Sequence, residues 1–501
     1  MLLVALAAVA LYLPTLGYDF AYDSVTQVQI DDFIHQPRHF ADLLTLRVLG
    51  MDALDFNRPV NLFTLMVDSL LWGKNPAGYR LTNLLLHGAV VALLFRWLRM
   101  MTGNFPAALG AALLFAVHPL HCETVVEVGY REDLLATFFL LAGLNAAAAF
   151  EPGSRGKCCG PAILVVACLF LSAASKETGI AGPALLLVFW LLFRRRKPTD
   201  QRGWAVLVAI AIATTGTFFA LRFALEPKPS LIFNNPPPAI APPGIEWLLA
   251  QSRIWSGEFL NIVWPSHLCA DYGSYNLRSI DPALALIGIL FLIMAQIALA
   301  FWSRKAAFAC AIFWAALLPV SNLIPIYRPM ADRYLYMPMM GVALLAALAL
   351  ASIQSRHVRR WSRMAVLAGV GGLTVATLRQ QTVWKDTISL WKDTSLQNPF
   401  SINGWMGQGY ACLEYNQPAQ ALQFFEHAVT LTHGQMAEPF AGIALAADAL
   451  GQSGQAAEAL TRASKLDSRY AKPDTLLRAL VYPAYQAQHF TLIAQRNHLA
   501  L

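Results

Sequence analysis

The stretch 364-MAVLAGVGGLTVATL is the last of a series of apolar segments, and the polar sequence 379-RQQTVWKD follows it at once. Before this point the chain contains a repeated series of apolar runs that approach or reach the length of a membrane-crossing helix. After it the chain is polar and rich in alanine. The sequence therefore predicts an all-α protein in two parts, a polytopic membrane domain at residues 1–378 and a soluble domain at residues 379–501.

The composition excludes an ordinary soluble enzyme. Hydrophobic residues make up 57% of the chain, charged residues make up 13%, and the mean hydropathy is +0.48. We expect about eleven transmembrane helices, and the first is expected to be retained because no basic segment of a signal peptide precedes it. The predicted spans centre on residues 2–16, 81–98, 105–117, 133–150, 161–174, 179–193, 204–224, 282–302, 306–319, 337–353 and 364–378.

The basic residues fall in every second loop, which predicts the orientation. They cluster near 96–99, 155–157, 194–202, 304–305 and 356–363, and the positive-inside rule assigns these loops to the cytoplasm. The first loop (17–80), the large loop (225–281) and the soluble domain are then extracytoplasmic. Three cysteines would share that side, where a disulfide is chemically possible, but their pairing stays open: Cys122, Cys269 and Cys412.

The outward loops carry more ionisable residues than a spacer needs, and charged groups near the ends of membrane helices tend to mark functional sites. Loop one also contains 59-PVNLFTLMVDSLLWG, an amphipathic pattern that predicts a helix along the membrane surface. In the large loop, 234-NNPPPAIAPPG cannot be helical and is expected to form an extended strap. The segment that follows it, from residue 247, is expected to enter the membrane without crossing it.

His118, His121 and Glu123 are residue types that bind metals. Their spacing differs from the His-Glu-x-x-His zinc signature, and Pro119 interrupts the helix that such a site would use. We therefore favour a hydrogen-bonded helix cap that lines a donor pocket. No metal ligand set is assigned, although a divalent metal remains possible, and no cofactor is certain.

The soluble domain contains helix-pair repeats. Residues 405–428, WMGQGYACLEYNQPAQALQFFEHA, match the tetratricopeptide signature, and a degenerate copy begins at residue 440. Arrays of this kind usually bind a peptide or protein on their concave face. We therefore expect Trp405, Tyr410 and Phe425 to belong to a region that binds a protein partner.

Several segments in order resemble the C-superfamily (GT-C) membrane glycosyltransferases that carry C-terminal tetratricopeptide repeats. These are relatives of the protein O-mannosyltransferases, including the cadherin-targeting transmembrane enzymes. The matching pieces are 20-FAYDS, 57-NRPVNLF, 79-YRLTNLLLH, 115-FAVHPLHCETVVEVGYREDLLATFF, 175-SKETGIAGP, 264-WPSHLCADYGSYNL, 322-NLIPIYRPMADRYLYMP and 391-WKDTSLQNPFS. The resemblance covers nearly the whole chain.

The resemblance implies transfer of a sugar from a polyprenyl-phosphate carrier to a protein hydroxyl, with inversion at the sugar carbon. It carries the role of catalytic base to Asp23, since a hydroxyl nucleophile needs a carboxylate to accept its proton. Cations would hold the leaving phosphate, although each arginine has an alternative as a headgroup anchor or an ion pair, for example with Asp332. The residues expected to bind donor phosphate or substrate are Arg58, His118, His121, Glu123, Arg131, Lys176, Glu177, Arg328 and Arg333.

Two positions depart from the family pattern. Ser24 replaces the second member of an acidic pair, and Arg80 stands where histidine is usual. Ser24 keeps open the alternative of an inactive scaffold that presents the repeats. A transporter of lipid or sugar is a further alternative, although the charged residues lie at one membrane face and not near the midplane, where transporter sites usually lie. We expect an integral protein of a bacterial inner membrane with periplasmic repeats. The alternative is the endoplasmic reticulum membrane with lumenal repeats.

Overall fold

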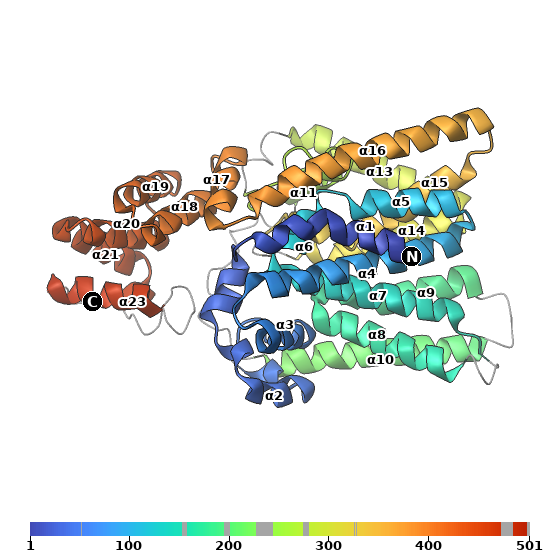
Figure 1. The fold of residues 1–501 in the computed structure, drawn as a ribbon, viewed down its shortest axis with the longest axis horizontal. Coiled ribbons are helices and arrows are strands. Elements are labelled where there is room, and N and C mark those ends of the chain that lie inside the picture. Colours follow the sequence, from blue (N-terminus) through green and yellow to red (C-terminus); the bar gives the residue numbers. More distant parts are fainter. Residues whose placement is uncertain are drawn as a thin grey trace.

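A computed structural model describes residues 1–51, 53–152, 158–194, 201–226, 244–273, 280–324, 326, 328–471 and 484–497. Helices form all the regular structure in these ranges, and Figure 1 shows a bundle of long helices with a smaller helical module beyond one end. The all-α prediction is confirmed. The proline strap at 234–243 and the basic residues of 155–157 and 195–197 lie outside the described residues.

Each predicted apolar segment contains a bundle helix. Six helical stretches of the described chain are long and apolar enough to cross a membrane, and shorter apolar helices accompany them. The protein is therefore an integral membrane protein, while the number of crossings stays a prediction. The helices are α1 (Leu2–Tyr12), α4 (Pro76–Thr102), α5 (Phe105–Ala116), α7 (Arg131–Ala149), α8 (Cys159–Ser175), α9 (Ala181–Phe189), α10 (Gln201–Leu225), α13 (Pro282–Trp302), α14 (Arg304–Leu317), α15 (Met339–Ser352) and α16 (Arg356–Val383).

Capping residues define the sharp turn between α4 and α5. Helix α4 ends at Thr102, and the capping residue Gly103 has a φ of 68°, in the left-handed region that glycine adopts without strain. The next residue, Asn104, accepts a hydrogen bond from the backbone N–H of Ala107 and so caps α5. Two long apolar helices can therefore run antiparallel after a connection of two residues.

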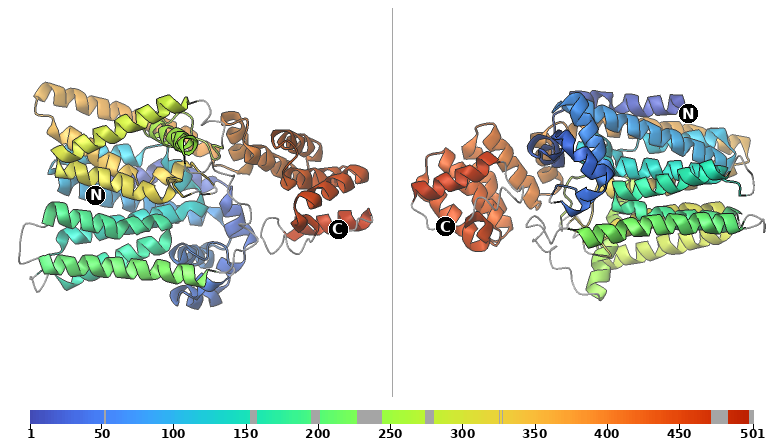
Figure 2. Two further views of the ribbon diagram at one scale, coloured as in Figure 1. Left: turned by 180° about the vertical axis from the view of Figure 1, so that it is seen from behind. Right: turned by 90° about the horizontal axis from the view of Figure 1, so that it is seen from below.

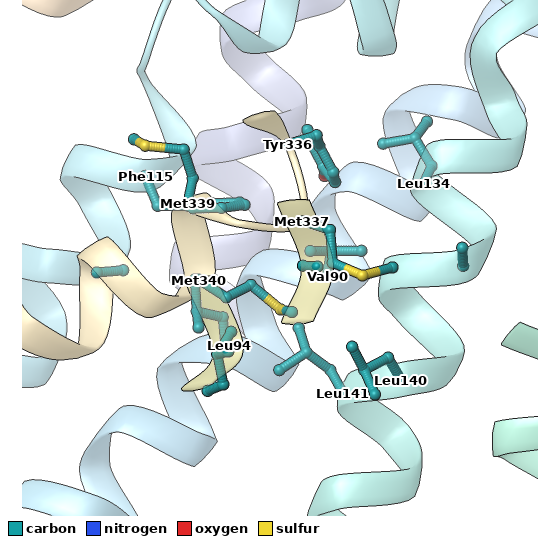
Figure 3. Close-up of a cluster of buried hydrophobic side chains, with 14 of the residues drawn as sticks. Val90, Leu94, Phe115, Leu134, Leu140, Leu141, Tyr336, Met337, Met339 and Met340 are labelled. Carbon is teal, nitrogen blue, oxygen red and sulfur yellow. The ribbon is translucent and has the colours of Figure 1, made fainter. Parts of the chain in front are cut away.

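The centre of the bundle is a continuous apolar core. Figure 3 shows Met337, just before α15, and Met340, in its first turn, in one cluster with Val90 of α4 and Leu141 of α7. Helices α14 and α15 approach so closely that a Cβ on Gly341 would lie 2.5 Å from the carbonyl oxygen of Ala309. Such small-residue contacts let membrane helices pack backbone to backbone.

Two helices at the Asp23 end correspond to the segments predicted to lie at the surface of the membrane or to enter it without crossing. Helix α3 (Pro59–Trp72) is seen nearly end-on in Figure 1, whereas the bundle helices run across the view. It follows the short helix α2 (Phe40–Leu44) and buries Leu62 and Leu65. Helix α11 (Ile245–Val263) is not among the stretches that are long and apolar enough to span a membrane, and that it enters the membrane without crossing stays a prediction.

The soluble module begins later than predicted, because α16 runs without a break past Leu378 to Val383. Helices α17 (Thr387–Gln397), α18 (Ile402–Glu414), α19 (Pro418–Leu431), α20 (Ala437–Ala449), α21 (Ser453–Leu466) and α23 (Ala484–Arg496) then form the module (Figures 1 and 2). The ring of Phe425 fills the space between α18 and α20, since Cβ atoms on Gly409 or Gly442 would lie 2.5 Å from it.

Hydrogen bonds hold the end of α16 and the start of the soluble module at the loop-one end of the bundle. The N–H of Asp19 donates to the carbonyl of Lys385 at 3.0 Å, and Gln381 donates to the carbonyl of Leu11 at 3.1 Å. At the opposite end, Arg304 donates to the carbonyl of Leu192, which follows α9. Loop one and the repeats therefore share one end of the bundle, and Arg304 lies at the other.

This arrangement makes the orientation testable. A reporter that works only outside the cytosol should be active when fused after Leu501 and inactive when fused within 194-RRRK, because the basic loops stay in the cytoplasm. Activity of both fusions in whole cells is the measurement. The reverse pattern would place Asp23 and the repeats in the cytosol and would contradict the predicted topology.

Candidate active site

Asp23 lies in a tightly constrained turn of loop one. The preceding residue, Tyr22, has a φ of 61° in the left-handed region, which is strained for a residue with a large side chain. Its ring lies against Trp384 and Trp391, so contacts from α16 and α17 hold the turn in place. Strain of this kind often accompanies a functional site, and here it directly precedes the predicted catalytic residue.

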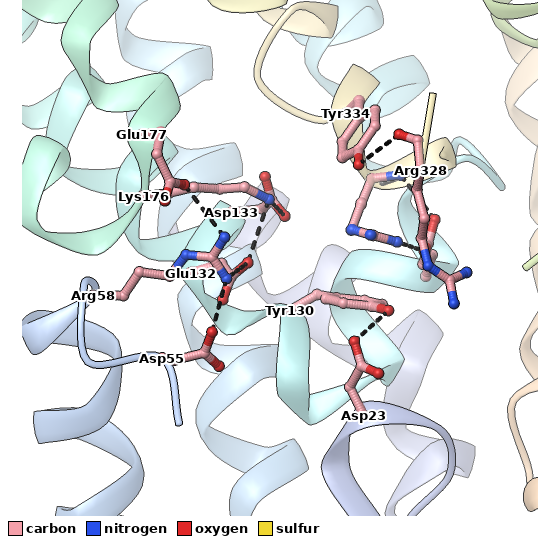
Figure 4. Close-up of polar contacts among 12 residues, drawn as sticks. Asp23, Asp55, Arg58, Tyr130, Glu132, Asp133, Lys176, Glu177, Arg328 and Tyr334 are labelled. Atoms are coloured by element: carbon pink, nitrogen blue, oxygen red, sulfur yellow. Dashed lines mark hydrogen bonds and ion pairs between the residues drawn. The ribbon is translucent and has the colours of Figure 1, made fainter. Parts of the chain in front are cut away.

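A tyrosine joins Asp23 to two other predicted residues. The hydroxyl of Tyr130 donates to Asp23 Oδ2 at 2.8 Å (Figure 4). The guanidinium of Arg333 lies 4.0 Å from the centre of the Tyr130 ring. Arg333 in turn forms a buried ion pair with Glu123, whose other oxygen accepts the backbone N–H of Arg333 at 2.9 Å. The predicted partner, Asp332, instead accepts hydrogen bonds from other residues.

Ser24 is buried and fastens the turn instead of facing the site. Its hydroxyl donates to the carbonyl of Ala21 at 2.7 Å, and its N–H donates to Glu127 Oε1 at 2.7 Å. Burial, together with the nearby Asp23 charge, raises the pKa of Glu127 to about 8. An acidic residue at position 24 would therefore place a second carboxylate in a buried environment that already contains Glu127.

Arg328 faces the same cavity as Asp23. Its guanidinium lies 4.8 Å from the centre of the Tyr22 ring and donates to the carbonyl of Ala270 at 3.0 Å. Within the described residues Arg328 forms no ion pair, in contrast to Arg58 and Arg333. The cavity has a volume of about 590 Å³ and is lined by loop one between Asp19 and Gln29, by Arg328, by α17 and α18, and by the start of α20.

A second cluster of charges lies beside the first (Figure 4). Burial raises the pKa of Asp55 to about 7 despite the opposing charge of Arg58, and neighbouring carboxylates raise it further. Because all the predicted cations of this cluster already face carboxylates, they have less capacity to bind a phosphate. The ion pairs are Arg58 with Glu132 (2.7 Å), Asp55 (3.2 Å) and Glu177 (3.3 Å), Lys176 with Asp133 (2.5 Å) and Glu132 (3.4 Å), and Arg222 with Glu177 (2.9 Å).

Arg131 does not face the cavity, so its predicted role is corrected. The side chain is completely buried and forms an ion pair with Asp68 at 2.5 Å. It also donates to Asn83 Oδ1 at 2.7 Å and to the carbonyl of Tyr79 at 2.9 Å. Arg131 therefore joins α7, α3 and α4 and cannot bind a ligand in this arrangement.

Neither predicted histidine lines the cavity. Nε2 of His118 lies 3.1 Å from the carbonyl of Ile262, and the backbone carbonyl of His118 accepts the N–H of His121 at 3.0 Å. The His121 ring is buried between Phe115 and Tyr336. The described residues contain no group of three ligands that could hold a metal ion, and all seven cysteines are free thiols.

The predicted partner-binding residues of the repeats separate into three environments. Tyr410 lines the cavity that contains Asp23. Trp405 packs on His427 and donates to the carbonyl of Pro399, away from the cavity. Phe425 is completely buried inside the repeats, so it is a core residue and the prediction that it contacts a partner is wrong.

Three residues of this site were not predicted. Tyr130 and Glu127 both lie within the quoted motif 118-HPLHCETVVEVGYRED, which marks the segment but not the individual side chains. Trp391 belongs to 391-WKDTSLQNPFS, where its place beside Tyr22 depends on the packing of the soluble module.

No protein-family model matches the chain. Curated proteins do: it is 26% identical over 409 residues to protein O-mannosyl-transferase F38B6.6 of Caenorhabditis elegans, covering 78% of this chain and 56% of that protein. It is 23% identical over 411 residues to human protein O-mannosyl-transferase TMTC3, covering 75% of this chain and 44% of that one. The sequence is thus similar to protein O-mannosyl-transferases, as the resemblance predicted, and the chain spans about half the length of these relatives.

A solved structure of ArnT from Cupriavidus metallidurans bound to undecaprenyl phosphate aligns with all of this chain and 88% of that one. The TM-score is 0.40 and the sequence identity is 17%. This likeness is remote and carries no weight for the site.

Proposed function

We propose that the protein is a GT-C-type membrane glycosyltransferase that moves a sugar from a polyprenyl-phosphate carrier to a hydroxyl of a protein on the extracytoplasmic side. One observation carries the proposal. Asp23 and Arg328 line the same cavity, and neither has an ion-pair partner in the described chain. The sequence similarity to protein O-mannosyl-transferases supports it, and mannose is the first sugar to test.

The residues of the cavity suit an inverting displacement. The acceptor oxygen attacks the sugar carbon from the side opposite the phosphate and loses its proton to the carboxylate of Asp23. The bond from that carbon to the phosphate oxygen breaks, and its electron pair leaves with the phosphate. Arg328 lies where it can balance the added charge, since a guanidinium binds phosphate oxygens through parallel hydrogen bonds.

Tyr130 positions the base in this proposal. Its hydroxyl donates to Asp23, and its ring lies under Arg333, which the ion pair with Glu123 holds in place. Glu123 and Arg333 thus support Asp23 through Tyr130. We place the protein in a bacterial inner membrane with periplasmic repeats; an endoplasmic reticulum membrane with lumenal repeats is the alternative.

The role of Arg328 gives the test of this function. Arg328→Ala should raise the KM for a polyprenyl-phosphate sugar by roughly 10- to 100-fold, because one charge-assisted hydrogen bond contributes about 1.5–3 kcal/mol. Transfer to a threonine-containing peptide by the purified protein in liposomes is the measurement. Arg38→Ala is the matched control, since Arg38 is an exposed arginine of loop one that lies outside the cavity. An unchanged KM in Arg328→Ala would contradict the assignment.

A further inference from the structure

The cavity that contains Asp23 has walls from both parts of the protein. Loop one provides one wall, and α18, the first helix of the repeats, provides another. The lining residues of α18 recur every four positions, at Ile402, Met406, Tyr410 and Glu414, so that a single face of the helix borders the cavity along its whole length. The repeats are therefore part of the cavity and not a separate module that only recruits a partner.

Hydrogen bonds fix this wall to the membrane domain. Asp271, in the loop after α11, accepts from the Ser401 hydroxyl at 2.6 Å and from the Asn403 amide at 3.1 Å. Asn398 donates to the backbone carbonyls of Asp271 and Tyr272 at 3.0 and 2.9 Å. The spacing between α18 and Asp23 is thus set by packed structure instead of a flexible linker.

The cavity is strongly acidic. Its lining contains one arginine, Arg328, and five carboxylates: Asp19, Asp23, Asp386, Glu414 and Glu438. Asp386 caps α17 by accepting the N–H of Ser389. Glu414 and Glu438, both from the repeats, form no ion pair within the described residues. These two carboxylates would repel an anionic donor phosphate from the repeat side of the cavity. We therefore expect a different ligand on that side.

The shape of the α18 wall suits an extended peptide. A helix of 13 residues is about 20 Å long at roughly 1.5 Å per residue, and about six residues of extended chain cover the same distance. Tyr410, Tyr415 and Trp391 contribute aromatic rings to the lining. Aromatic faces next to carboxylates attract lysine and arginine side chains.

We propose that the groove between loop one and α18 is the acceptor channel, and that Glu414 and Glu438 select acceptor segments carrying lysine or arginine next to the reactive hydroxyl. This inference rests on the proposed function and adds the class of acceptor. The donor headgroup binds at Arg328, the acceptor backbone runs along α18, and Asp23 lies on the opposite wall.

The test compares peptides that differ only in charge. Two labelled peptides each contain one threonine, flanked in one case by lysine and in the other by glutamate, and both binding to the full-length protein and transfer are measured. We expect the lysine peptide to bind and react better. Glu414→Gln/Glu438→Gln should raise the KM for that peptide roughly three- to tenfold, since two exposed ion pairs are lost.

Two further variants make the result specific. Glu426→Gln/Glu458→Gln is the matched control, because both acids are exposed on the repeats outside the cavity; it should leave peptide preference unchanged. Glu414→Lys/Glu438→Lys should reverse the preference towards the glutamate peptide.

The outcomes separate this inference from the proposed function. Transfer to both peptides with equal KM, or a control variant that matches Glu414→Gln/Glu438→Gln, overturns the inference alone. If the lysine peptide binds through Glu414 and Glu438 but neither peptide receives sugar, the groove remains a site for basic peptides and the proposed function fails.

Discussion

Asp23→Asn should reduce sugar transfer by a factor of about 10² to 10⁴, the range that positioned general bases contribute. The amide has nearly the shape of the carboxylate and can still accept the hydrogen bond from Tyr130, which measures 2.8 Å in the native protein. It cannot accept the proton of the acceptor hydroxyl. The fold, donor binding and peptide binding should therefore persist while the chemical step is lost. Transfer rates at saturating donor and peptide are the measurement.

Controls on the same loop decide whether the effect belongs to the cavity. Asp31→Asn and Asp32→Asn should be milder, because neither residue lines the cavity. Glu127, beside Ser24, is the alternative candidate for the catalytic base, and Glu127→Gln tests it. The pKa of the Glu127 carboxyl is raised to about 8, so this carboxyl is largely protonated at neutral pH and is a poor base there. If Glu127→Gln abolished transfer and Asp23→Asn did not, the two roles would have to be exchanged.

Arg131→Met should destabilise the protein by about 3–5 kcal/mol, the cost of leaving a buried charge without its partner. Asp68 would lose an ion pair at 2.5 Å and, among the described residues, retain the hydrogen bond from Thr82 at 2.8 Å. Thermal unfolding of the purified protein in detergent is the measurement, and a lower midpoint is expected.

The matched control removes both charges. Arg131→Met/Asp68→Asn should recover much of the stability lost in Arg131→Met, because no uncompensated charge remains. The same proteins test the original prediction for this arginine. A stable Arg131→Met protein with weakened donor binding would restore Arg131 as a phosphate ligand and contradict the structural role.

Hydropathy located the bundle helices but not their ends. The span expected at 81–98 belongs to a helix from Pro76 to Thr102, and the one at 364–378 belongs to a helix from Arg356 to Val383. An apolar window detects only the middle of a helix, whereas caps and polar turns extend it at both ends. This is why the domain boundary was placed several residues too early.

The site was predicted in part, for a physical reason. Asp23 was selected through the family resemblance, and Arg328 and Arg333 were selected as cations that could hold a leaving phosphate. Which cations are neutralised could not be read from the sequence, because the acid partner of Arg131 is 63 positions away and that of Arg333 is 210 positions away. The place of Tyr410 opposite Asp23 depends on how α18 packs against the bundle, which no local pattern encodes.

The most direct test of the proposed activity follows a labelled sugar from its lipid carrier. Full-length protein in liposomes receives polyprenyl-phosphate mannose labelled in the sugar, together with the threonine peptide flanked by lysine. We predict label on the peptide hydroxyl with the wild-type protein and none above background with Asp23→Asn. Label that stays on the carrier with both proteins, or that merely changes membrane leaflet, would contradict the glycosyltransferase and favour a scaffold or a transporter.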